Sequence, residues 1–145
     1  SSSSAASDVY KRQIIFRGDM MFAVVKTFND SRVIADKCLV GNSISLRLKG
    51  LLGKKSLSEN EALWLKPCNG IHTWFMKFPI DVVYLDKNLK ILALYPNLKP
   101  WKFHFPHWGS ASVLELASGT IMNASLKIGD KLCIDSQSSL EKKRG

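Results

Sequence analysis

The sequence predicts a mainly β domain, a compact antiparallel sandwich or barrel-like fold that carries two short helices. Most of the chain consists of short runs of strand-forming residues separated by turn residues such as Asn29, Asp30 and Gly41. Only two stretches have the apolar spacing of a helix, and no internal repeat is present. A chain of 145 residues is long enough to bury one sizeable core. We therefore expect a single β-rich domain over residues 20–138.

The two ends of the chain differ in composition from this domain. Residues 1–19 begin with a serine and alanine run and have only a three-residue apolar stretch, residues 14–16, which is too short for a secretory signal. Residues 139–145 are mostly charged or small. We expect both ends to be tails outside the fold, the first one disordered or non-native.

The expected strands follow the runs of β-branched, aromatic and aliphatic residues. They cover residues 20–28, 32–40, 62–66, 71–78, 81–85, 90–95, 112–116 and 131–135. Pro79 interrupts this pattern and indicates an edge or a bend, and residues 86–88 predict a hairpin turn. Residues 96–109 contain three prolines and several aromatic residues, so we expect a long loop that is functional or packed down as a lid.

Two short helices are expected, each amphipathic and packed on the sheet. The first begins after a cap at Asn42 or Ser43 and ends near Gly53, with one apolar face formed by Ile44, Leu48, Leu51 and Leu52. The second starts at Ser118 or Gly119, with one buried face formed by Ile121, Met122, Ser125 and Leu126.

Charge and cysteine content limit the function classes. The net charge is +9, but the basic residues are scattered, with only Lys54 and Lys55 adjacent within the domain. This favours a solubilising surface, and a nucleic-acid accessory role is kept as an alternative. No apolar run is long enough to span a bilayer. The three separated cysteines do not form a disulfide framework, which predicts a cytoplasmic protein.

Residues 68–86 combine strand formers with groups capable of chemistry. An extended conformation would place His72, Trp74 and Met76 on one face. Asp81 follows Pro79 at the start of the next strand. Its carboxylate is a candidate general base or ligand contact. The alternative is structural: Asp81 would accept backbone hydrogen bonds at the bend.

Glu115 is the second candidate acid. It lies within the apolar run of residues 113–117, where alternation points it away from Leu114 and Leu116. We therefore expect Glu115 to face solvent. If its strand lined a cavity instead, Glu115 and Asp81 would form a carboxylate pair.

Metal and nucleophile chemistry find little support. Cys68 and His72, and likewise His104 and His107, lack the spacing of known zinc sites. Cys68 would need His72 as its base, and a glycine at position 70 separates the two. The glycine-rich run at residues 50–56 lacks the spacing of a phosphate-binding loop. We predict no metal site and no cofactor.

The motif I-H-T-x-F-M-x-F-P-I-D within residues 68–86 resembles a bacterial and archaeal family, domain of unknown function number 192. Further matching pieces lie at residues 50–54, 97–101, 113–120 and 128–130. The resemblance implies a compact, mainly β, sandwich-like domain with short helices, and it implies no activity. The histidines and aromatic residues at 103–108 depart from the family pattern.

The leading hypothesis is a small cytoplasmic β domain that binds a small molecule or a peptide in an aromatic and methionine-lined pocket. The expected ligand-binding residues are Trp74, Met76, Asp81, Lys99 and Trp101. The first alternative is an enzyme, a hydrolase or transferase working by acid–base catalysis with Asp81 and His72, and with Glu115 as a further candidate. The second is the basic nucleic-acid accessory protein.

Overall fold

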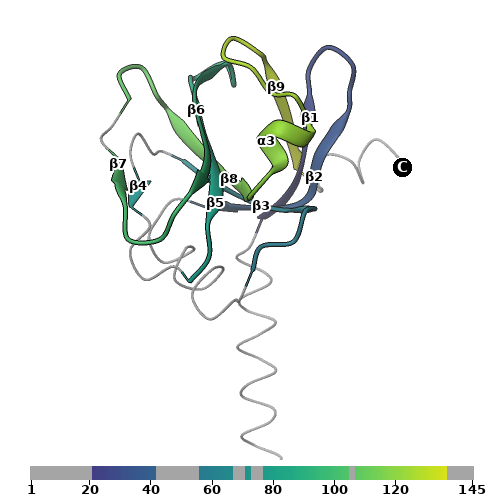
Figure 1. Ribbon diagram of the computed structural model, residues 1–145. Helices are drawn as coiled ribbons and strands as arrows, with labels where there is room; N and C mark the ends of the chain where they lie inside the picture. Colours follow the sequence, from purple (N-terminus) through teal and green to yellow (C-terminus); the bar gives the residue numbers. More distant parts are fainter. Residues whose placement is uncertain (1–20, 42–55, 67–70, 73–76, 105–106, 137–145) are drawn as a thin grey trace, which may run out of the picture.

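The body of the protein is a curled seven-stranded sheet (Figure 1). The computed structural model describes residues 21–41, 56–66, 71–72, 77–104 and 107–136. The seven strands are β1 (Met21–Thr27), β2 (Val33–Gly41), β3 (Glu61–Leu65), β5 (Ile80–Leu85), β6 (Ile91–Leu98), β8 (Ser112–Ala117) and β9 (Leu132–Ser136). A separate pair consists of β4 (Ile71–His72) and β7 (Phe103–His104). The predicted mainly β, barrel-like fold class is confirmed.

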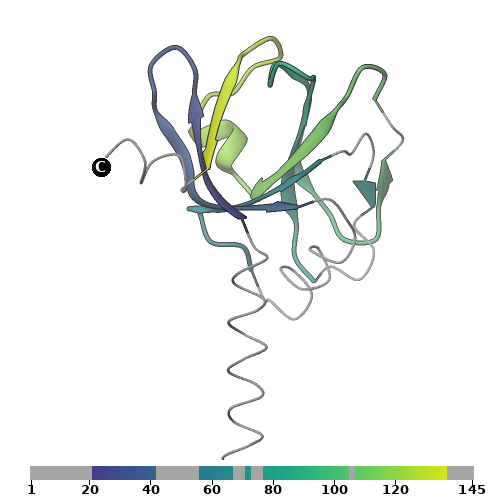
Figure 2. The ribbon, with the colours of Figure 1, turned by 180° about the vertical axis from the view of Figure 1, so that it is seen from behind.

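The strand order in the large sheet is β6-β5-β8-β3-β2-β1-β9. All neighbours pair antiparallel except β2 and β3, which run parallel. At one end the two edge strands meet, because the Ile91 N–H donates to the Asp130 carbonyl at 2.8 Å and the Leu132 N–H donates to the Leu89 carbonyl at 2.9 Å. The sheet thus curls into a half-barrel with a concave interior (Figure 2).

Apolar side chains cover both faces of this sheet. One cluster fills the concave interior and includes Val25, Cys38, Val83 and Leu114. The other covers the convex face and includes Leu63, Val82, Tyr84 and Val113. The central strands β5 and β8 are therefore buried at every position, not at alternate ones.

Helix α3 (Thr120–Asn123) lies inside the concave face (Figure 1). Ile121 and Leu126 are buried in the concave cluster, as predicted for the second helix. The prediction was wrong for Met122, which is 79% exposed, and for Ser125, which is also exposed. The helix has four residues, little more than one turn, so its buried side is narrower than the sequence spacing suggested. The predicted first helix and both predicted tails lie outside the described residues.

The predicted loop at residues 96–109 contains more strand than expected. Strand β6 continues through Pro96 to Leu98, which is possible because β6 lies at the edge of the sheet. Ile80 and Val82 pair with Leu98 and Tyr95, so β6 has one extra residue there, a β-bulge. Strand β7 also falls in the predicted loop.

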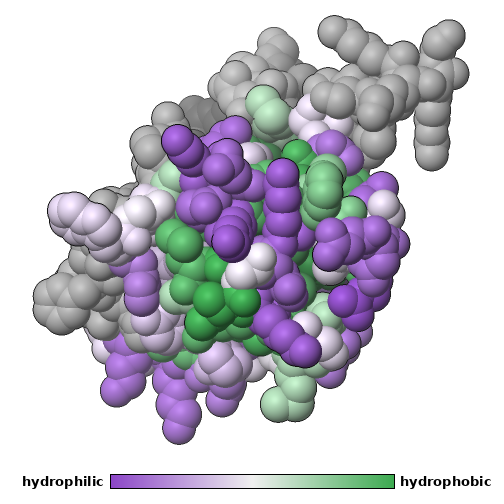
Figure 3. All heavy atoms as spheres, turned by 90° about the horizontal axis from the view of Figure 1, so that it is seen from above, coloured by the Kyte–Doolittle hydropathy of each residue, from purple (hydrophilic) through white to green (hydrophobic). Residues whose placement is uncertain are grey.

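The end of the molecule seen from above exposes a hydrophobic area bordered by hydrophilic side chains (Figure 3). Exposed apolar side chains are common on soluble domains. In the part of the chain that the structure describes, no helix has the length and apolarity needed to cross a membrane.

Candidate functional site

Asp81 is fully buried on the concave face, where its carboxylate joins three segments. Oδ1 accepts the Asn97 N–H at 2.8 Å, from the bulge in β6. Oδ2 accepts the N–H groups of Gly119 at 3.1 Å and Ile121 at 2.8 Å, at the start of α3. Hydrogen bonds to a charged acceptor are among the stronger ones in proteins. Asp81 therefore fixes α3 and the end of β6 against β5.

These contacts correspond to the structural alternative considered for Asp81. The bulge and the left-handed conformation of Asn97, with φ 52°, release its N–H from the strand pairing. Gly119, with φ 96°, turns the chain sharply between β8 and α3 so that two further N–H groups point at the same carboxylate. The backbone conformations of Asn97 and Gly119 thus direct three N–H groups to the Asp81 carboxylate.

Glu115 is also completely buried, so the expectation that it faces solvent was wrong. It alternates with Leu114 and Leu116, which lie in the concave cluster, and therefore points to the convex face. Val82 and Leu63 of that face are its cross-strand neighbours. Alternation correctly predicted that Glu115 and the two leucines point to opposite faces of the sheet. The convex face is covered by other residues, however, so Glu115 does not reach solvent.

Asp81 and Glu115 do not form the carboxylate pair that the sequence allowed. Asp81 lies opposite Leu116, whereas Glu115 lies opposite Val82. Because successive side chains point to opposite faces of a sheet, the two acids are separated by the sheet itself. No single cleft holds both carboxyl groups.

The convex face carries an aromatic cluster formed by Tyr84, Tyr95 and His107. The Tyr84 ring centroid lies 4.5 Å from that of His107 and 5.7 Å from that of Tyr95, the latter pair in an edge-to-face arrangement. The Tyr95 hydroxyl is hydrogen-bonded to His107 Nε2. Glu115 lies diagonally across from Tyr84 in the strand register, a position where Cα atoms are about 7–8 Å apart.

Sequence reasoning considered His107 only as a metal ligand and missed both tyrosines. The hairpin gave a usable signal, since pairing across the turn at residues 86–88 places Tyr84 and Tyr95 on one face two positions apart. The position of His107 depends on how the chain folds back after β7, which no local pattern indicates.

A hollow of about 630 Å³ opens where β3 and β5 end and β8 begins. We call it the Trp64 hollow, and it is lined by Trp64, Lys66, Asp86, Lys87, Leu89, Ala111 and Ser112. Trp64 and Leu89 also pack against the concave cluster, so the hollow is continuous with the apolar interior. Its volume is in the range of sites for small organic molecules.

The polar groups of the Trp64 hollow are mainly cationic. Lys66 Nζ lies 4.1 Å from the centre of the Trp64 ring, a cation–π contact. The Asp86 carboxylate accepts the N–H groups of Asn88 at 2.8 Å and Lys90 at 2.9 Å, which holds the β5–β6 turn. Among the described residues, the buried Trp64 Nε1 has no hydrogen-bond partner. Such donors are rare in native proteins and need an explanation.

The remaining predicted pocket residues are distributed differently. Trp74 and Met76 lie outside the described residues, and His72 is placed only by its backbone, which pairs with Phe103 in the small sheet. Lys99 and Trp101 are exposed, Trp101 by 61% and with a left-handed φ of 65°. Asp81 is buried, so the structure does not bring it to the surface that carries Lys99 and Trp101.

Cysteine and metal chemistry find no support in the described residues. Cys38 and Cys133 are not disulfide-bonded, and burial raises the pKa of Cys38 to about 12, which keeps it protonated and unreactive. Cys68 lies outside the described residues. Where side chains are described, no group of three or more His, Cys, Asp and Glu residues is arranged to hold a metal ion.

Sequence comparison finds relatives among archaeal proteins. The profile of the family described as "Uncharacterized ACR" (DUF192) matches residues 25–134. UPF0127 proteins of Thermococcus sibiricus and Pyrococcus furiosus are 34% and 36% identical over 62 residues, 43% of this chain. The matched segment covers 40% and 53% of those proteins, so this chain spans about half of their length.

Two solved structures have a similar fold. A protein of unknown function from Novosphingobium aromaticivorans matches with a TM-score of 0.64 at 18% identity, over 79% of this chain and 84% of its own. A proposed transcription regulator from Sinorhizobium meliloti matches with a TM-score of 0.63 at 17% identity, over 79% and 93% of the two chains. At such identities the likeness concerns the fold alone. The family match extends over most of the folded region, and the chain therefore belongs to the DUF192 family of uncharacterised proteins.

Proposed function

We propose that this chain is a binding domain for a small organic anion, held in the Trp64 hollow. The observation that carries the proposal is the hollow itself, about 630 Å³ in volume, with an aromatic and aliphatic wall and two lysines at its rim. Ligand sites typically combine an apolar wall with a few polar groups that fix orientation. The hollow has both features.

The charges select the ligand class. Lys66 and Lys87 outnumber Asp86, whose Oδ1 is already engaged by the turn. A carboxylate or phosphate would be attracted to the two ammonium groups, and a flat apolar body would pack on Trp64 and Leu89.

A second proposed ligand site is the pocket predicted from the sequence. Its residues are Trp74, Met76, Asp81, Lys99 and Trp101. The acid–base alternative with Asp81 and His72 has less support. The Asp81 carboxylate is fully buried and accepts three backbone hydrogen bonds, so a substrate could reach it only after α3 had been displaced. Binding of an anion in the Trp64 hollow does not require α3 to move.

The test is a thermal-shift screen of organic anions, aromatic carboxylates and nucleoside phosphates among them, on the full chain. At a hundredfold excess over its dissociation constant a ligand adds about 2.7 kcal/mol of stability, which raises Tm by on the order of 10 °C in a domain of this size. Lys66→Gln and Lys87→Gln should each reduce the shift strongly. Lys37→Gln, an exposed lysine on β2, is the matched control.

Two results would overturn the proposal. One is a screen in which no anion raises the Tm of the unaltered chain. The other is a set of stabilising compounds whose shifts are the same in Lys66→Gln, Lys87→Gln and Lys37→Gln, because those compounds would bind elsewhere. The variant Trp64→Phe keeps an aromatic ring in the wall, so it should stay folded. A smaller Tm shift in this variant would then reflect weaker ligand binding and not loss of folding.

A further inference from the structure

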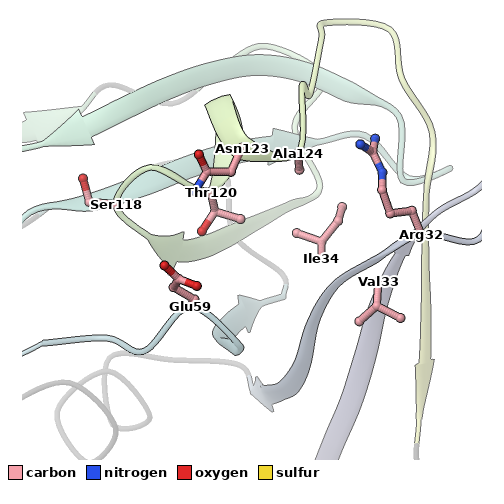
Figure 4. Close-up of a pocket in the computed structure, with 8 residues that line it drawn as sticks. All are labelled: Arg32, Val33, Ile34, Glu59, Ser118, Thr120, Asn123 and Ala124. Carbon is pink, nitrogen blue, oxygen red and sulfur yellow. The ribbon is translucent and has the colours of Figure 1, made fainter.

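Figure 4 shows a second hollow, of about 190 Å³. Its lining residues place it at the end of the sheet opposite the Trp64 hollow. We call it the Arg32 hollow, and its lining includes Arg32, Ile34, Glu59, Thr120 and Ala124. The neighbouring Ser118 follows the end of β8, whereas Ser112 of the Trp64 hollow begins it. Six residues of strand separate the two hollows by roughly 20 Å. They are therefore independent sites.

Opposite charges lie on different sides of the Arg32 hollow. Glu59 is on one side and Arg32 on the other, with Ile34 between them (Figure 4). Ile34 belongs to the concave cluster and Ala124 packs against it, so the floor of the Arg32 hollow is apolar. Arg32 Nε also lies 3.8 Å from Asp30 Oδ2, an exposed ion pair that a ligand carboxylate would share or displace.

The turn that carries Arg32 is held in place by its backbone. Arg32 donates its N–H to Thr27 Oγ1 at 3.0 Å, and its carbonyl accepts the Thr27 N–H at 2.9 Å. On the other side, the turn that carries Glu59 is closed by the Glu61 N–H, which donates to the Ser58 carbonyl at 2.9 Å. Both charged side chains thus start from fixed backbone positions.

The third wall is α3, which Asp81 holds through the N–H groups of Gly119 and Ile121. Thr120, between these two residues, donates its hydroxyl to the Ala117 carbonyl at 2.7 Å, so its oxygen can still accept a hydrogen bond from a ligand. A hollow whose walls are fixed before binding loses little conformational freedom when a ligand enters. Asp81 is in this sense a positioning residue for the hollow.

We infer that the Arg32 hollow binds a small zwitterion of amino-acid size. The ligand carboxylate would pair with the Arg32 guanidinium, its ammonium group with the Glu59 carboxylate, and its side chain would lie on Ile34 and Ala124. The volume of about 190 Å³ is enough for a small molecule of amino-acid size.

The experiment is a titration of the full, isotope-labelled chain with free amino acids at millimolar concentration, followed by amide NMR shifts. Arg32, Ile34, Glu59 and Thr120 should shift in a saturable way. The α-amide of the same amino acid lacks the carboxylate, and its N-acetyl derivative lacks the ammonium group. Each should bind at least tenfold more weakly.

Arg32→Gln and Glu59→Gln should also weaken binding at least tenfold, and both positions are exposed, so the fold should persist. Lys37→Gln, an exposed lysine on β2 that lines neither hollow, is the control and should bind like the unaltered chain. The inference is refuted if no amino acid shifts these amides, if the single-charge analogues bind equally well, or if both variants keep full affinity. None of these outcomes depends on whether the Trp64 hollow binds an anion.

Discussion

Asp81 and Glu115 are completely buried on neighbouring strands of one sheet, and their carboxyl groups point to opposite faces. Asp81 lies in the concave interior and accepts three backbone N–H groups from two other segments. Glu115 lies on the convex face, diagonal to Tyr84 and its aromatic partners. Asp81 holds the backbone of α3 and of the end of β6 in place. Glu115 is instead an acidic side chain buried within a largely apolar face.

Replacing Asp81 with Ala should lower the free energy of unfolding by about 3–5 kcal/mol, because each buried donor left without an acceptor costs about 1–3 kcal/mol. Asp81→Asn keeps the size of the side chain but loses the charge and one acceptor oxygen, and we expect a loss of about 2 kcal/mol or more. Urea denaturation followed by circular dichroism measures both values.

The exposed Asp36 on β2 supplies the control, since Asp36→Asn should change stability by no more than about 0.5 kcal/mol. If Asp81→Ala unfolded at the same urea concentration as the unaltered chain, the three hydrogen bonds would contribute nothing to the fold. Amide exchange at Ile121 gives a local reading, because that N–H should lose protection in both Asp81 variants.

Much of the sheet was predictable because strand formers and turn residues alternate clearly along the chain. The sequence did not predict which strands lie at the edge of the sheet or whether each face of the sheet is covered. Glu115 was expected at the surface because alternation distinguishes two faces but does not tell whether each face is covered. Pro96 was expected to end a strand, yet β6 turned out to be an edge strand that tolerates it.

The candidate sites depend even more on tertiary structure. The Trp64 hollow joins the ends of β3 and β5 with the start of β8, and the Arg32 hollow joins two turns with α3. Residues such as Arg32 and Glu59 have nothing unusual in their local sequence. They become neighbours only through the sheet order, in which β3 lies between β2 and β8.

The contact between Tyr95 and His107 should be measurable as a coupling energy. Tyr95→Phe removes the hydroxyl that bonds to His107 Nε2 and keeps the ring. A double-mutant cycle with His107→Leu should give a coupling of about 0.5–1.5 kcal/mol, the usual net value of one hydrogen bond. A coupling near zero would mean that the bond does not contribute to the stability of the convex face.

The buried thiol of Cys38 should be far less reactive than that of Cys133, which is partly exposed on β9. With its pKa raised to about 12 by burial, Cys38 is almost entirely protonated at pH 8, and only the thiolate reacts. Alkylation of the folded chain, followed by peptide mass spectrometry, should show Cys38 reacting at least about 100-fold more slowly than Cys133. Equal rates would contradict the burial of Cys38.

The same shift predicts a loss of stability in alkali. The folded chain holds the Cys38 proton more tightly than the unfolded chain, whose thiol has the ordinary pKa of about 9. The contribution to stability is therefore complete below pH 9 and decreases as the pH rises towards 12, by up to about 1.4 kcal/mol per pH unit. Cys38→Ala should show a shallower decline than the unaltered chain over this range, and parallel curves would argue against the shift.

Ser31 offers a stabilising substitution. It has a left-handed φ of 54° in the exposed turn between β1 and β2, where its N–H donates to the Thr27 carbonyl at 3.1 Å. A side chain in this conformation costs roughly 1–2 kcal/mol, and glycine avoids that cost while losing about 0.5–1 kcal/mol through greater freedom of the unfolded chain. Ser31→Gly should therefore stabilise the protein by up to about 1 kcal/mol, whereas Ser31→Val, with a β-branched side chain, should destabilise it by more than about 1 kcal/mol. Thermal unfolding of the three proteins measures both differences, and a Ser31→Val variant as stable as Ser31→Gly would show that the turn does not require the left-handed conformation.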